Sequence, residues 1–68
     1  MKLHLAEVQK IKKRREELGI TQSHIAKVFG KTKAWWSKKE MESKEGIDPE
    51  IEVNSNQLIE LNGLLGNH

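Results

Sequence analysis

The chain contains no cysteine, one proline and only three aromatic residues among its 68 residues. Without cysteine it cannot form disulfides or thiolate-ligated zinc sites. No apolar run approaches the ~20 residues that a membrane span needs, and Met1–Leu5 has no signal-peptide core. His4, His24 and His68 lack metal-ligand spacing and are interpreted as surface residues. We therefore expect a cytoplasmic protein with no metal, no cofactor and no membrane partner.

Motifs of enzymes are missing as well. The sequence has no glycine-rich phosphate loop, no cysteine nucleophile and no Ser/His/Asp set in an activating context. A chain this short buries only about 60% of its unfolded surface, which leaves little room for a closed pocket. We expect a single domain over residues 1–68 that is not an enzyme, stabilised by helix packing or self-association.

Charge is divided unevenly along the chain, although the formal net charge is only +2. Residues 1–39 hold eleven of the twelve basic residues and three acids, a net charge of +8. Residues 40–68 hold one lysine and seven acids, a net charge of −6. This distribution predicts one basic face and one acidic face. The basic run Lys10–Arg15 is interpreted as a solvated helix face.

Apolar periodicity and capping residues predict three helices in the first part of the chain. Residues 5–18 place Leu5, Val8, Ile11 and Leu18 on one face, and Gly19 ends this helix. Thr21 is a natural N-cap for a second helix over residues 22–29, and Thr32 caps a third helix that runs to about Met41.

Residues 42–53 interrupt the helical pattern, since Gly46 and Pro49 lie within them and residues 50–53 alternate as an extended segment does. We expect a loop that inserts Ile47, Ile51 and Val53 into the core. A last helix over about 55–65 begins with an Asn54/Gln57 capping box. Gly63 costs this helix roughly 1 kcal/mol relative to alanine, which favours an early end. Its expected buried stripe is Leu58, Ile59, Leu61 and Leu65.

The stretch from Gln22 to Glu40 has the spacing of a helix-turn-helix. Its fifth residue, Ala26, is small where two helices cross closely, and its ninth, Gly30, tolerates a left-handed turn. The fourth, eighth and fifteenth residues are apolar and would join the two helices; they are Ile25, Phe29 and Trp36. An ordinary helix pair in a small bundle would not need Ala26 and Gly30 in this register.

Residues 8–41 resemble the Cro/CI-type (XRE) helix-turn-helix family of phage and bacterial repressors. The resemblance rests on Arg14-Arg15, Gly19-Ile20-Thr21-Gln22, Ile25-Ala26, Gly30 and Ser37-x-x-Glu40. It implies an all-α, small four-helix, lambda-repressor-like domain with its helix-turn-helix at about residues 21–41. The family usually has a further helix or two after this motif, and here one candidate follows.

The resemblance also implies a transcriptional regulator that binds operator DNA, as a homodimer if the operator is palindromic. Such a dimer would have to use the helical domain itself. Lys33 would donate to guanine O6 and N7, while Lys27, Lys31 and Lys38 would contact phosphates. Gln22 would bond to a phosphate and brace the third helix. The full set of implied DNA contacts is Gln22, Ser23, Lys27, Lys31, Thr32, Lys33, Ala34, Ser37 and Lys38.

Three features depart from the family pattern. Lys31 and Lys39 occupy the tenth and eighteenth positions, which are usually apolar, and Trp35 stands beside Trp36. Adjacent helical residues point ~100° apart, so both tryptophans cannot face one core. We assign Trp36 inward and leave two alternatives for Trp35, a core residue or a partly exposed anchor for another protein.

These departures support a second hypothesis with the same fold. The acidic segment from Glu40 to Glu52 directly follows the third helix, where it would repel phosphate and attract a basic partner. The protein would then be an antirepressor or modulator that binds a partner repressor and blocks its DNA binding. The implied contacts are Trp35, Lys38, Lys39 and Glu42.

Overall fold

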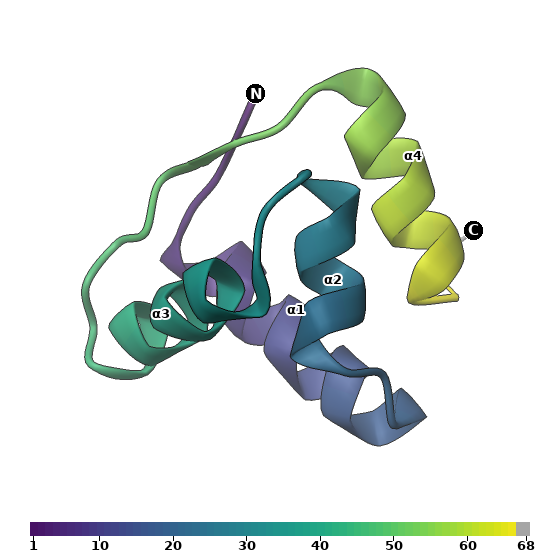
Figure 1. The fold of residues 1–68 in the computed structure, drawn as a ribbon. Coiled ribbons are helices and arrows are strands. Elements are labelled where there is room, and N and C mark those ends of the chain that lie inside the picture. Colours follow the sequence, from purple (N-terminus) through teal and green to yellow (C-terminus); the bar gives the residue numbers. More distant parts are fainter. Residues whose placement is uncertain (67–68) are drawn as a thin grey trace.

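The computed structural model describes residues 1–66, which form four helices and a two-stranded sheet. The helices are α1 (Leu5–Leu18), α2 (Gln22–Val28), α3 (Lys33–Lys44) and α4 (Ser55–Leu64), and the strands are β1 (Lys2–Leu3) and β2 (Ile51–Glu52). Figure 1 shows α2 between α3 and α4. α1 packs against α3. The expected small all-α, four-helix domain is confirmed. No helix within residues 1–66 is long and apolar enough to cross a bilayer.

The helix ends follow the predicted capping residues. The Thr21 and Thr32 hydroxyls accept hydrogen bonds of 3.2 and 3.3 Å from backbone N–H groups three residues later. Asn54 and Gln57 form the reciprocal capping box. These side chains satisfy N–H groups that a helix cannot pair internally. Two glycines adopt the left-handed conformation that ends a helix or allows the turn before α3: Gly19 at φ 69° and Gly30 at φ 66°.

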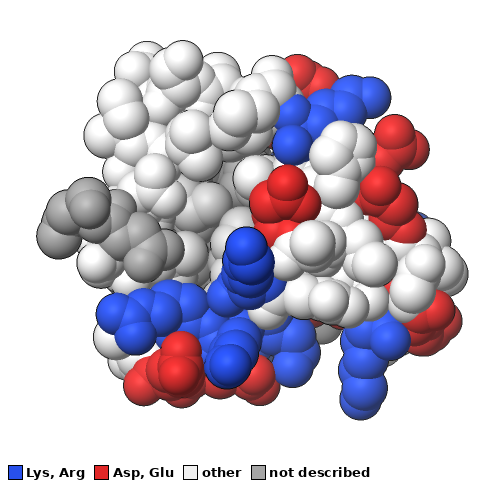
Figure 2. Space-filling view, turned by 180° about the vertical axis from the view of Figure 1, so that it is seen from behind, with Lys and Arg blue, Asp and Glu red and all other residues white. Residues whose placement is uncertain are grey.

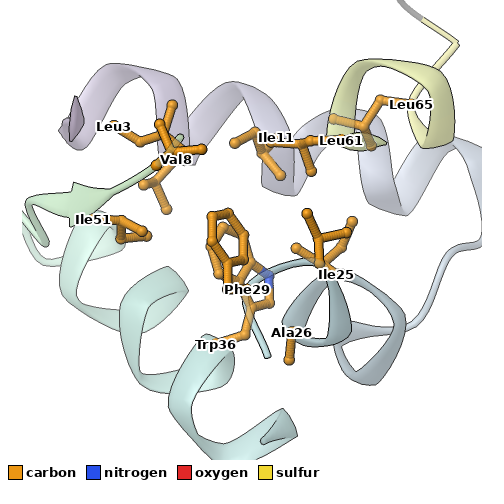
Figure 3. Close-up of a cluster of buried hydrophobic side chains, with 12 residues drawn as sticks. Leu3, Val8, Ile11, Ile25, Ala26, Phe29, Trp36, Ile51, Leu61 and Leu65 are labelled. Atoms are coloured by element: carbon orange, nitrogen blue, oxygen red, sulfur yellow. The ribbon is translucent and has the colours of Figure 1, made fainter. Parts of the chain in front are cut away.

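The core is built around two stacked aromatic rings (Figure 3). Phe29 lies 5.7 Å from Trp36 between ring centroids, with only 10° between the ring planes. Ala26 is fully buried beside them, which explains why the crossing of α2 and α3 requires a small residue. Side chains from every element complete this core: Leu3, Val8, Ile11, Ile25, Val28, Ile51, Val53, Leu61 and Leu65.

Sequence reasoning missed the strand pairing of the N-terminus. Leu3 pairs with Ile51 in antiparallel register, and the Val53 N–H donates to the Met1 carbonyl at 2.9 Å. Of residues 50–53, which were predicted to be extended, Ile51 and Glu52 form β2, because β1 supplies their backbone partners. Glu50 differs from the prediction, since its backbone is left-handed. The pairing turns Leu3, Ile51 and Val53 into the core.

Asp48 links the loop before β2 to the start of α1. Desolvation raises the pKa of Asp48, but the Glu50 N–H and the His4 ring, with Nδ1 at 2.9 Å, together hold it below its ordinary value. A carboxylate with a lowered pKa stabilises the fold above its unfolded pKa, and this contribution is lost as the pH falls through the folded pKa. Because the pair is exposed, its contribution is small.

One predicted helix boundary was wrong, since α3 continues past Met41 to Lys44. α4 covers the predicted range closely and ends at Leu64, so Gly63 does not cause the early end that it was expected to favour. The extra turn of α3 is held against α1, because the Gln9 amide donates to the Ser43 carbonyl at 3.0 Å and Ser43 is fully buried. Glu42 and Lys44 are also good helix formers, so the helix continues until just before Gly46.

Three side chains expected in the core are exposed. Leu18 is 44% exposed, Ile47 50% and Ile59 69%. Leu18 is the last residue of α1, at the end of the helix. Ile47 lies in the loop before β2, and in β2 it is Ile51 whose side chain points inward. Ile59 is turned about 100° from Leu58, so it lies off the side of α4 that holds Leu61 and Leu65.

Candidate nucleic-acid interface

A buried carboxylate joins the three helices that carry the helix-turn-helix. Glu40 on α3 is only 2% exposed. Its Oε1 accepts from Arg15 Nη2 at 3.0 Å and Gln22 Nε2 at 2.8 Å. Its Oε2 accepts from Arg15 Nε at 2.8 Å and Trp36 Nε1 at 2.6 Å. Each oxygen therefore has two donors, and the cluster fixes α3 against α1 and α2.

This Glu40 cluster (Arg15, Gln22, Trp36 and Glu40) changes two interpretations of charge. Glu40 is neutralised within the fold and Glu42 is half-buried, so the exposed acids of this segment begin at Glu45 rather than at Glu40. The basic run of α1 is not entirely a solvated face, because Arg15 is bound to Glu40 and Arg14 Nε donates to the Leu65 carbonyl at 3.0 Å.

Only part of the Glu40 cluster could have been identified from the sequence. Trp36 and Glu40 are four residues apart, so both lie on one face of a helix. Arg15, Gln22 and Glu40 all belong to the positions that carry the family resemblance. Nothing in their spacing, however, shows that they meet, because Arg15 and Glu40 are 25 residues apart.

The exposed surface of α2 and α3 is positive. Lys27, Lys31, Lys33 and Lys38 are exposed, and no acid within residues 1–66 lies within 4.0 Å of their ammonium groups. Between residues 18 and 41 the only acid is Glu40, which is buried. We call these four side chains the lysine face. Its ammonium groups form no ion pair within residues 1–66 and remain free for an anionic partner.

The remaining residues expected to contact DNA surround this lysine face. Ser23, Thr32 and Ala34 are exposed, and Ser37 is half-buried. Gln22 is half-buried, and its amide donates to Glu40, so its expected role in bracing the third helix is confirmed. Its phosphate contact stays a prediction. The Thr32 hydroxyl caps α3 and is accessible beside Lys33.

Trp35 was expected to be either a core residue or a partly exposed anchor, and its position lies between these two alternatives. It is half-buried, with its ring centroid 5.5 Å from Phe29 and 6.2 Å from Trp36. Lys39 Nζ lies 5.7 Å from the ring centroid and 3.8 Å from Glu42 Oε1. The stem of Lys39 therefore covers part of the ring, which explains how a lysine is tolerated where an apolar residue is usual.

A concavity adjoins Trp35 on the side of β2. Its volume is about 370 Å³, and it lies between the turn before α3, the outer side of α3 and the strand β2. One wall is aromatic and basic and the other carries Glu50 and Glu52; the lining residues are Phe29, Lys31, Trp35, Lys39, Glu50, Ile51, Glu52 and Gln57. Glu50 has a left-handed backbone, with φ 45°, which is uncommon for a residue with a side chain.

No model of a known family, no curated protein and no solved structure matches the chain. The resemblance to Cro/CI-type regulators therefore rests on the positions quoted above. What the protein binds must be argued from the lysine face, the Glu40 cluster and the surfaces beside them.

Proposed function

We propose that the protein binds double-stranded DNA through α2 and the first half of α3, as a small cytoplasmic transcriptional regulator of the Cro/CI kind. The observation that carries this proposal is the lysine face: four exposed lysines whose ammonium groups form no ion pair within residues 1–66. Lysines that neutralise phosphates release condensed counterions, and this supplies affinity for any duplex. A fixed helix beside them supplies the means to read bases.

The first turns of α3 would enter the major groove. Lys33, Ala34 and Ser37 would face the bases, and Lys33 would donate to guanine O6 and N7. Lys27 on α2 and Lys31 in the turn before α3 would contact phosphates. These contacts would position the protein on the duplex without reading its base sequence. The Glu40 cluster supports this role, since it holds α3 in place before DNA arrives. The half-buried Glu42 and the exposed Glu45 at the end of α3 disfavour phosphate there, which restricts DNA contact to the first half of the helix.

Selection of duplexes from a random pool at low salt tests this proposal. The protein is expected to enrich a short motif. Lys33→Ala should lose the preference at one base pair, since a good base contact contributes about 1–3 kcal/mol of discrimination. Lys27→Ala should weaken binding to all duplexes alike. Lys10→Ala on α1 is the matched control and should change neither property. Retention of no duplex by the wild-type protein would contradict the proposal.

One observation favours a second candidate, binding of a partner repressor protein. The concavity beside Trp35 offers an aromatic surface next to two carboxylates, which suits a basic segment of another protein. The contacts would be Trp35, Lys38 and the Lys39–Glu42 pair. Co-expression with a repressor encoded nearby, followed by a size measurement, separates the candidates. A complex that Trp35→Ala abolishes supports the antirepressor; the same complex with that variant contradicts it.

A further inference from the structure

The concavity beside Trp35 lies along an edge of the sheet that no other strand covers. It is lined by Glu50, Ile51 and Glu52 and by no residue of β1, so it lies on the side of β2 away from β1. Within residues 1–66 the sheet consists of β1 and β2 alone. The second edge of β2 therefore faces the concavity and has no strand to pair with.

The strand register determines which backbone groups point into the concavity. The Val53 N–H donates to the Met1 carbonyl, so these residues are a hydrogen-bonded pair of the antiparallel ladder. Bonded and non-bonded pairs alternate along such a ladder, and the next pair is Lys2 with Glu52. The N–H and C=O of Glu52 consequently point away from β1, and no turn or loop of residues 1–66 supplies a partner for them. One donor and one acceptor of the main chain are thus open at the concavity.

The side chains around these open groups form two unlike sets. Phe29 and Trp35 form an apolar surface together with Ile51, and their ring centroids lie 5.5 Å apart. Glu50 and Glu52 line the side of β2. Their ion pairs with the N-terminal residues, at 3.8 and 3.4 Å, are exposed to solvent and therefore weak. Both carboxylates can accordingly accept hydrogen bonds from a further basic group.

We propose that an extended segment of another protein adds to β2 as a third strand in this concavity. Its backbone pairs with the open N–H and C=O of Glu52, the mode by which a peptide adds to a free sheet edge. The residue opposite Glu52 points to the same side as the Glu52 side chain, and its two neighbours point to the side of Phe29 and Trp35. A basic residue between two apolar residues therefore fits both sets of side chains. The inference rests on the second candidate function, binding of a partner protein, and specifies how that partner is held.

Charge and pairing disfavour other occupants of the concavity. The carboxylates of Glu50 and Glu52 repel the phosphates of DNA, and they repel an acidic segment at the edge where its backbone must pair. In a second copy, the basic strand within residues 1–66 is β1, which its own β2 already pairs. Lys31 and Lys39 lie on the opposite wall, where the segment presents apolar side chains.

The exposed side of α4 carries no comparable selection. Figure 2 shows a broad uncharged region over α4, at the upper left, while charged side chains gather elsewhere on this face. Such a surface has no charge that distinguishes one partner from another. The edge of β2 combines carboxylates, aromatic rings and open backbone groups, and these three features together match an extended basic and apolar segment.

Selection from a library of random displayed peptides on the immobilised wild-type chain tests the proposal. It should enrich peptides with a basic residue between two apolar residues. Glu52→Pro removes the N–H that points into the concavity and keeps the ladder with β1, since proline is tolerated where a strand N–H is unpaired. It should raise the dissociation constant of a selected peptide at least about tenfold. Lys2→Pro is the matched control, because the Lys2 N–H points away from β2 at the opposite edge, and it should leave peptide binding unchanged.

A change in the selected peptide tests the same contact without altering the protein. Methylation of its backbone nitrogens one at a time should weaken binding at least about tenfold at the nitrogen that donates to the Glu52 carbonyl, and much less at the next nitrogen along. A library that yields no binding peptide would overturn the proposal. So would a peptide that tolerates methylation at every nitrogen, a result that decides even if Glu52→Pro does not fold.

The same variants separate this inference from the second candidate function. A complex with a co-expressed repressor that Trp35→Ala abolishes and Glu52→Pro leaves unchanged would overturn strand addition and keep partner binding. Peptides that lose affinity for Glu52→Pro, without any complex with such a repressor, would support strand addition and contradict the repressor as its partner.

Discussion

Glu40→Leu is expected to lower the free energy of unfolding by about 3–5 kcal/mol. The substitution leaves the Arg15 guanidinium, whose side chain is only 12% exposed, without its counter-ion. It also removes the acceptors of the Gln22 amide and the Trp36 indole N–H. Domains of this size have a total stability of about 3–10 kcal/mol, so the expected loss is a large fraction of the total. Urea titration followed by far-UV circular dichroism measures the loss.

Two variants show whether this loss comes from the buried charge. Glu42→Gln changes a carboxylate on the same helix whose ion pair within residues 1–66 is longer, 3.8 Å to Lys39, and should shift stability by less than about 0.5 kcal/mol. Arg15→Met combined with Glu40→Leu removes both charges and should be more stable than Glu40→Leu alone. Equal stability of Glu40→Leu and the wild-type chain would contradict the role given to the cluster.

Trp36→Ala and Trp35→Ala should differ widely, although the two residues are adjacent. Trp36 is fully buried, stacks on Phe29 and donates to Glu40, so its loss should cost about 3–5 kcal/mol. Trp35 is half-buried against the same cluster, so its loss should cost about 1–2 kcal/mol. Thermal unfolding of both variants measures the difference. Similar melting temperatures would contradict the assignment of Trp36 as the central core residue.

The features that sequence predicted correctly depend on residues close together in the chain. Thr21, Thr32 and the Asn54/Gln57 box cap backbone groups within three residues of themselves. Ala26 and Gly30 satisfy local geometric needs of the turn. Exposure of the lysines on α2 and α3 followed from the same register, since the apolar positions fix which side of each helix is outside.

The features that sequence did not predict depend on distant partners. Arg15 forms an ion pair with Glu40, which lies 25 residues later in the chain. The Met1 carbonyl accepts a hydrogen bond from Val53, near the other end of the chain. Neither contact leaves a periodic signal. Ile59 was assigned to the core because apolar residues are usually buried, yet the side of α4 that it occupies has no packing partner within residues 1–66.

The salt dependence of DNA binding tests the role of the lysine face most directly. Fluorescence anisotropy with the selected duplex, from about 50 to about 200 mM salt, should give a log–log slope of about −4 to −5, as expected for ~4–6 neutralised phosphates. Lys27→Gln with Lys31→Gln should make that slope less steep by about 2. A slope near zero, or one that this double variant leaves unchanged, would contradict the proposal that the lysine face binds DNA.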